Sequence, residues 1–205
     1  SSNAAELLGP DEVQSLLDGL KERAAQLAAS LSPNPLPLTT LTQVLKGLLS
    51  ENITLKEFRR IASAIAVAAQ KTLDAEEIVE LIRPQLGALI IQKLCGMREP
   101  LRVMTLDGQL EGLLAQAMRA DTGRRHVIEP DLGRRITEAL THAAQPLLAE
   151  AKPFALVVQP GVRIAMRKLL RTCLPDTPVL SFFEVPEEKA VEVVAVIGAP
   201  QALAA

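Results

Sequence analysis

The residues of this chain whose types and spacing could best support a chemical role are cations that recur at helical spacing near the C-terminus. They are Arg163, Arg167, Lys168 and Arg171. Residues four apart share one side of a helix, so the spacing predicts a basic face opposite an apolar stripe. An acid-rich segment follows, and its candidates are Glu184, Glu187 and Glu188. The acids are either intramolecular neighbours of the basic face or its complement on a second subunit. Sequence alone favours the plainer explanation, a solvated face on an amphipathic surface helix.

Catalytic and metal-binding chemistry find little support in the sequence. Ser181 has no assignable His and Asp partners, and Cys173 falls on the apolar side of its predicted helix rather than in an electropositive pocket. The two histidines of the chain do not make a ligand cluster. We therefore predict a binding platform rather than an enzyme, with no cofactor and no metal, and with both cysteines as free thiols in a reducing compartment.

Composition bounds the class of protein. The chain has 205 residues, of which 48% are hydrophobic and only 2% aromatic, so a sizeable core must be built from aliphatic side chains. The net charge of −2 argues against general nucleic-acid binding, which usually shows as a strongly positive balance. No run of about 18 apolar residues occurs, so no membrane span is expected in this sequence.

Apolar residues recur every three or four positions in the first part of the chain, and this period predicts helices. The expected helices cover 11–30, 39–50, 54–69 and 74–94. The expected start and stop signals are a Thr39 or Thr40 cap, a capping box of Thr54 and Glu57, an Asp74 cap and a break at Pro84. Leu45 and Phe58 are expected to pack in the core of this helical part.

From Leu101 the pattern changes to short β-branched runs that alternate with helical stretches, which is typical of a small α/β unit. Strands are expected over 101–105, 155–159, 179–183 and 191–197, and helices over 108–119, 130–150 and 162–173. The predicted fold class is α+β and predominantly helical. A helical, winged-helix-like subdomain is followed by a small α/β subdomain of about four strands.

The expected organisation has five parts. They are a vector-derived tag at 1–4, a linking helix and proline-rich connector at 5–37, the helical subdomain at 38–98, the α/β subdomain at 99–198 and a flexible tail at 199–205. Because the chain opens on a tag-like stretch without Met, we expect it to be a fragment of a longer protein.

Several short motifs occur in an order that resembles one known family. They are Leu38-Thr39-Thr40-Leu41, the segment 51–59, Val103-Met104-Thr105-Leu106-Asp107, Ile128-Glu129-Pro130-Asp131-Leu132, Pro160-Gly161-Val162-Arg163, and Val179-Leu180-Ser181 followed by Glu184-Val185-Pro186. Together they resemble the C-terminal part of the FlhA/LcrD/InvA family, the large membrane components of flagellar and virulence type III export gates. Two departures are Lys56-Glu57, where the family usually has Arg-Asp, and Phe182-Phe183, in a slot that is often more polar.

The resemblance implies a non-enzymatic role in the cytoplasmic domain of a bacterial inner-membrane protein. Such domains form a nonameric ring in the full-length protein and receive export substrates, their chaperones and soluble export-apparatus components. The membrane would be reached only through a missing N-terminal half. With the resemblance added, we favour docking over a solvated face for the basic helix and its acidic neighbours. The Leu38 and Ile128 motifs favour the flagellar branch.

Two alternatives to a flagellar export gate remain open. One is the virulence (injectisome) homologue. The other is a winged-helix DNA-binding regulator, suggested by the helices between Thr39 and Leu94, whose third helix offers only Lys56, Arg59 and Arg60 as a basic surface. An enzyme that uses the α/β part ranks behind both.

Overall fold

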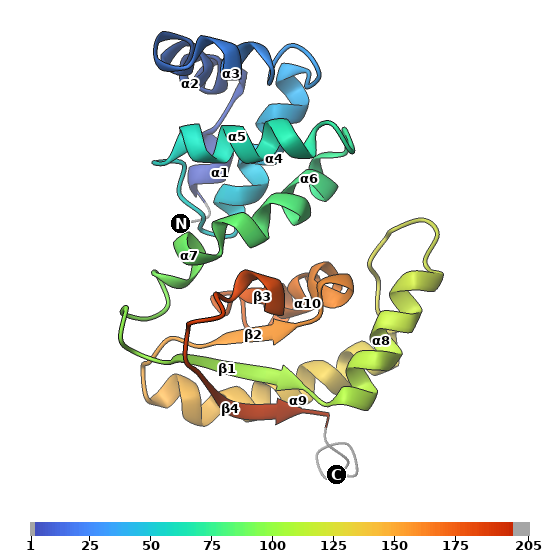
Figure 1. Cartoon of the computed structure of the whole chain (residues 1–205). Coiled ribbons are helices and arrows are strands. Elements are labelled where there is room, and N and C mark those ends of the chain that lie inside the picture. The colour runs from blue at the N-terminus through green and yellow to red at the C-terminus, as the bar shows by residue number, and fades with distance from the viewer. Residues whose placement is uncertain (1–2, 199–205) are drawn as a thin grey trace. The chain divides into compact units, whose positions relative to one another are not determined.

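The computed structural model describes residues 3–198, which fold as two compact units that divide between Leu89 and Ile90 (Figure 1). The expected tail at 199–205 and the first two residues of the expected tag lie outside the described residues. The division falls within helix α7 (Gly87–Ile91), earlier than the expected boundary at 98/99. The polar stretch 92–100 therefore belongs to the α/β unit.

The first unit is helical. Its elements are α1 (Asn3–Leu7), α2 (Pro10–Arg23), α3 (Ala25–Ala29), α4 (Leu38–Ser50), α5 (Phe58–Ala68), α6 (Ala75–Ile82) and the 3-10 helix η1 (Arg83–Leu86). The first expected helix is divided at Ala24, whose φ of −149° and ψ of 69° are not helical. Leu45 is fully buried in the core of this unit, as expected.

Helix starts in this unit follow the sequence signals only in part. The Asp74 cap is confirmed, because its carboxylate accepts a hydrogen bond from Glu77 N at 2.9 Å. The Thr39 or Thr40 cap is wrong, because α4 already begins at Leu38, directly after Pro37. The Thr54 capping box is also wrong. The Thr54 hydroxyl accepts from Lys56 N at 3.3 Å and closes a local turn, a competing use of such side chains.

A buried ion pair supports the break that Pro84 imposes. Helix α6 ends at Ile82, and the following 3-10 turn contains Pro84, so the expected division of this helix is confirmed. Within that turn, Arg83 is almost completely buried and its Nη1 lies 3.2 Å from Glu51 Oε2, at the end of α4. The pair fixes the end of α6 against α4.

The second unit is a parallel sheet with helical crossovers. Its strands are β1 (Leu101–Leu106), β2 (Ala155–Val158), β3 (Val179–Ser181) and β4 (Val191–Ile197), and its helices are α8 (Gly108–Ala120), α9 (Pro130–Ala149) and α10 (Pro160–Cys173). The strand order is β3-β2-β1-β4, and every neighbouring pair is parallel. A 3-10 turn, η2 (Phe182–Glu184), follows β3. The predicted fold class, with its four short strands, is confirmed.

One hydrophobic core holds this unit together. Alternate residues of β1 and β2, such as Met104 and Leu156, pack in it with Leu140 of α9 and Met166 of α10. Consecutive right-handed crossovers in one direction place their helices on the same side of a sheet, and the shared core agrees with this. Among residues 3–198, no helix combines the length and the apolar character that crossing a membrane requires.

Candidate interaction surfaces

Helix α10 carries the basic residues that the sequence singles out, but it does not present all of them to solvent. Arg163 is 0% exposed, and its Nη1 donates to the Val179 carbonyl of β3 at 3.0 Å. Residues 162–166 are all buried, so α10 has no solvent side over this stretch, although Pro160 and Gly161 at its start are exposed. Arg163 is therefore not part of a docking surface, and this part of the prediction is wrong. Its role is to tie α10 to an edge strand.

Glu184 is the second correction. It is 2% exposed, and its carboxylate accepts a hydrogen bond from Ser181 N at 3.1 Å, closing the η2 turn after β3. Because the η2 turn brings Glu184 back to Ser181 at its start, the carboxylate is buried. Arg163 and Glu184 thus both act on β3, one at each end of the strand, and both have structural roles.

The remaining basic residues form a smaller surface, which we call the α10 basic face: Arg167, Lys168 and Arg171. Arg167 is half-buried, whereas Lys168 and Arg171 are exposed. Lys168 Nζ donates to the Arg125 carbonyl at 3.1 Å and so holds the α8–α9 loop against α10. Within the part of the chain that the structure describes, the Arg171 side chain forms no ion pair.

Arg134 on helix α9 differs from Arg171, because two neighbouring carboxylates balance its charge. Arg134 lies 2.9 Å from both Asp131 and Glu138, three and four residues away along α9. Hydrogen bonds to these two carboxylates raise the pKa of Arg134. Its charge is balanced by two neighbouring carboxylates, so Arg134 has little to offer an acidic partner, whereas Arg171 has no carboxylate partner among residues 3–198.

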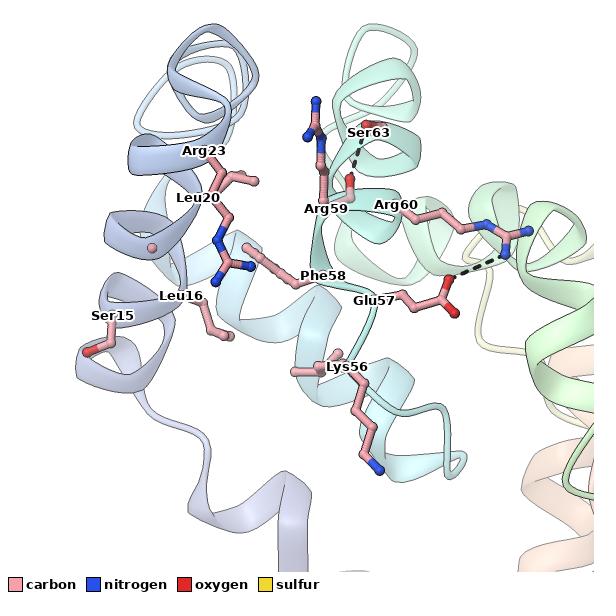
Figure 2. A pocket seen from close by; sticks show the side chains of 12 residues that line it. Ser15, Leu16, Leu20, Arg23, Lys56, Glu57, Phe58, Arg59, Arg60 and Ser63 are labelled. Carbon is pink, nitrogen blue, oxygen red and sulfur yellow. Dashed lines mark hydrogen bonds and ion pairs between the residues drawn. The ribbon is translucent and has the colours of Figure 1, made fainter.

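A surface pocket in the helical unit was not anticipated from the sequence. We call it the Phe58 pocket; it has a volume of about 800 Å³, and α2 and α5 supply its walls. The floor is formed by Leu16, Leu20, Leu55 and Phe58. Figure 2 shows the Phe58 side chain pointing from the start of α5 towards α2.

Phe58 was expected in the core, and the structure corrects this, because its side chain is only half-buried. It is the first residue of α5, since the helix starts one turn later than the expected capping box would place it. At that position Phe58 lines the pocket together with Leu16 and Leu20 of α2, of which Leu20 is buried. The apolar period identified the correct side of the helix but not the gap opposite it.

The rim of the Phe58 pocket is basic. Arg60 is engaged elsewhere, because it donates to the Gln85 carbonyl at 3.0 Å and approaches Glu57 at 3.5 Å. Arg23, Lys56 and Arg59 line the pocket and form no ion pair within residues 3–198. An apolar floor under unpaired cations suits an apolar group flanked by carboxylates.

A second unusual surface lies in the α/β unit, immediately after β3. Phe182 and Phe183 are 48% and 64% exposed, and their rings stack edge to face with centroids 4.6 Å apart. Glu187 and Glu188 follow and are both exposed. We call residues 182–188 the Phe ridge. Half of the four phenylalanines of this chain are thus adjacent and exposed, which the departure at Phe182-Phe183 could have signalled.

Groups suited to covalent or metal chemistry stay scattered. Among residues 3–198, no three His, Cys, Asp or Glu side chains gather as a metal site would require. Burial raises the pKa of the Cys173 thiol, which keeps the sulfur in its unreactive protonated form.

Comparison with known proteins gives these surfaces a family context. The sequence model of the FHIPEP family matches residues 1–190. The chain belongs to the FHIPEP family. Flagellar biosynthesis protein FlhA of Yersinia enterocolitica is 31% identical over 198 residues, which are 97% of this chain and 28% of that protein. Invasion protein InvA of Salmonella typhimurium is 26% identical over 196 residues, which are 95% of this chain and 28% of InvA.

Several solved structures share the fold of this FHIPEP chain. Chlamydia pneumoniae CdsV in its complex with CdsO superposes with a TM-score of 0.85 at 26% identity, covering 95% of this chain and 57% of CdsV. Nonameric EPEC SctV-C superposes with a TM-score of 0.83 at 23% identity, over 95% of this chain and 59% of that chain. This FHIPEP chain spans little more than a quarter of the curated relatives, at 28% of their length. Membership supports the export-gate interpretation over the DNA-binding regulator.

Proposed function

We propose that this chain is a cytoplasmic, non-enzymatic platform of a flagellar type III export gate, and that it takes part in ring assembly and in docking of export components. The observation that carries the proposal is the family match across residues 1–190. The higher identity to FlhA than to InvA, 31% against 26%, supports the flagellar branch. In this role the chain would act in an inner-membrane protein of the export gate.

Two observations support the assembly and docking parts of the proposal. EPEC SctV, whose fold this chain shares, is nonameric, and Chlamydia CdsV is found in a complex with a second protein, CdsO. The α10 basic face offers this chain a surface for such a partner. Arg171 is exposed and unpaired among the described residues, so it can pair with a carboxylate of an incoming protein without first breaking a local ion pair.

The test of the flagellar role is genetic. Deleting the gene in its host should abolish swimming, and the full-length gene should restore it. Arg171→Glu in that gene should leave the melting temperature of the purified chain unchanged, since surface substitutions usually change stability by no more than about 0.5 kcal/mol. It should reduce swimming, because like charges oppose association with an acidic partner. Lys152→Glu makes the same charge change at an exposed lysine of the α9–β2 loop, which forms no ion pair among the described residues, and should swim normally.

Two results would count against this proposal. A deletion strain that swims normally would remove the flagellar role. A correctly folded Arg171→Glu strain that swims like the wild type would remove the docking role of the α10 basic face, and leave it as a solvated surface.

The virulence branch is the second candidate, favoured by two solved structures of the same fold: the EscV cytosolic domain, which comes from a type III secretion system, and the C-terminal domain of InvA. It predicts normal swimming and loss of secreted virulence proteins in the deletion strain. The same two strains therefore separate the branches.

A further inference from the structure

We propose that the Phe ridge of one copy of this chain binds in the Phe58 pocket of a second copy. The inference rests on the self-assembly part of the proposed function and deepens it, because it names the two surfaces that neighbouring copies would use. Both surfaces are complete within residues 3–198, one in each unit, and neither depends on how the two units are arranged.

The pocket provides an apolar receptor of suitable size. Its floor is built from Leu16, Leu20 and Leu55 with the Phe58 ring, and its volume of about 800 Å³ has room for a pair of aromatic rings. Aromatic rings favour edge-to-face and offset contacts with one another, so Phe58 is a suitable neighbour for an incoming phenylalanine.

The ridge provides a matching ligand. Phe182 and Phe183 are exposed side by side, and each leaves about half or more of its surface in water. Exposed adjacent aromatic rings are costly to hydrate and are typical of the central residues of protein interfaces. In a chain that is only 2% aromatic, no other described pair of aromatic rings stacks in this way.

The charges of the two surfaces are complementary. The pocket rim carries Arg23, Lys56 and Arg59, none of which is paired within the described residues. The ridge carries Glu187 and Glu188, which are exposed and equally unpaired there. Glu57 is the single carboxylate that lines the pocket, and it already lies 3.5 Å from Arg60. Docking would therefore bring unpaired acids to unpaired bases.

The ridge is held in place before it binds. Ser181 N bonds the Glu184 carboxylate at its start, and Lys189 Nζ donates to the Gly96 carbonyl at 2.8 Å just after its end. Val185 N also donates to Phe182 O at 3.4 Å within the turn. A ligand that is already ordered loses less conformational entropy on binding, which favours association.

The contact has a definite symmetry consequence. Pocket and ridge are different surfaces, so pairing two copies leaves one free pocket and one free ridge. Such a heterologous contact repeats head to tail and closes into a ring when the rotation per copy allows it. Two phenylalanines and a few ion pairs make a small interface, so at micromolar concentration we expect mainly monomer. A membrane anchor would raise the effective concentration of neighbouring copies.

Cross-linking between singly labelled chains tests the pairing directly. In a Cys95→Ser, Cys173→Ser background, one chain carries Ser15→Cys at the pocket and the other carries Glu187→Cys on the ridge. A short bis-maleimide should join the mixed chains as a dimer, and such a product can only be intermolecular. Adding Phe182→Ser and Phe183→Ser to the ridge chain should lower the yield about tenfold, as loss of a binding hot spot does. Thr122→Cys, in the exposed α8–α9 loop, replaces Glu187→Cys as the control and should give background yield.

A charge exchange separates docking from misfolding. Arg23→Glu in the pocket chain should lower the yield when the ridge is wild type, and Glu188→Lys in the ridge chain should lower it when the pocket is wild type. Combining the two should restore cross-linking, because the opposite charges face each other again. A folding defect in either variant would not be repaired by the other.

Three results would overturn the pairing. The first is a cross-linking yield that changes neither with the phenylalanine substitutions nor with the charge substitutions. The second is a charge-exchanged pair whose yield stays low. The third is a cross-link that forms only within a single chain that carries both Ser15→Cys and Glu187→Cys. The last would show that the ridge fills the pocket of its own chain. Swimming of the deletion strain is scored separately. Failed cross-linking with lost motility removes only this pairing, whereas normal motility with successful cross-linking removes only the flagellar role.

Discussion

Replacing Arg163 by alanine should destabilise the α/β unit far more than the same change at Arg171, eight residues further along α10. Arg163 is 0% exposed and donates to a buried carbonyl of β3, whereas Arg171 is exposed. Removing the guanidinium takes a charged donor from that carbonyl, which costs about 1–3 kcal/mol. Removing its three methylenes from a packed interior adds about 2 kcal/mol.

The expected loss for Arg163→Ala is thus about 3–5 kcal/mol in the free energy of unfolding, against about 0.5 kcal/mol or less for Arg171→Ala. Urea unfolding followed by far-UV circular dichroism measures both, since the chain has no Trp or Tyr to provide a fluorescence signal. Hydrogen exchange should show that the lost protection falls on β3 and its neighbour β2, the strands that this arginine braces.

Equal and small effects at the two positions would refute the reasoning, because they would mean that the buried guanidinium contributes no more than a solvated one. A loss confined to the helical unit would refute it as well. Arg163→Lys is an informative intermediate. It keeps the charge and most of the stem but loses the planar fork, so its stability should lie between those of the wild type and Arg163→Ala.

Three further predictions follow from burial and backbone geometry. Phe58→Ala should cost about 1–2 kcal/mol and Leu45→Ala about 2–5 kcal/mol in urea unfolding, because Phe58 is half-buried and Leu45 fully buried; equal losses would place Phe58 in the core after all. Gly198→Ala should lower the melting temperature, because φ is +87° and an added Cβ would meet Leu110 Cδ2; an unchanged value would mean that this end of β4 shifts freely. Cys173 should react with iodoacetamide at pH 8 more slowly than a free thiol and recover in urea, because burial raises its pKa and reduces the thiolate fraction; a rate equal to that of glutathione would contradict this.

The sequence predicted the elements well where hydrophobic periodicity was long and undisturbed. The strands at 101–106 and 191–197 and the helix at 160–173 lie within a few residues of their expected positions. Periodicity records which side of an element meets the core, and that is why it predicted the α/β pattern and the fold class. Asp74 could be identified as a cap because it uses its own neighbours, so the signal is local.

Depth of burial was harder to predict, because it depends on segments far away in the sequence. Four-residue spacing put Arg163 on the same side as Arg167 and Arg171, but residues 162–166 of α10 are buried and Arg163 bonds to the Val179 carbonyl of β3. Glu184 is inside because a 3-10 turn returns it to Ser181. For Phe58, the side of the helix was right, and only the spacing of α2 across from it decides that the ring borders an open pocket.

The strand order has a consequence for how the chain can be made. Strand β4 pairs along the whole of β1, yet it follows 90 residues later, at residue 191 against residue 101. During synthesis, β1, β2 and β3 can associate with their helices before β4 has been made, and one edge of β1 is then unpaired. An open strand edge is a site of wrong pairing between chains. The α/β unit is therefore completed by its last strand. A chain terminated before Val191 would keep the sheet of β1, β2 and β3 but would leave the outer edge of β1 unpaired and prone to aggregation.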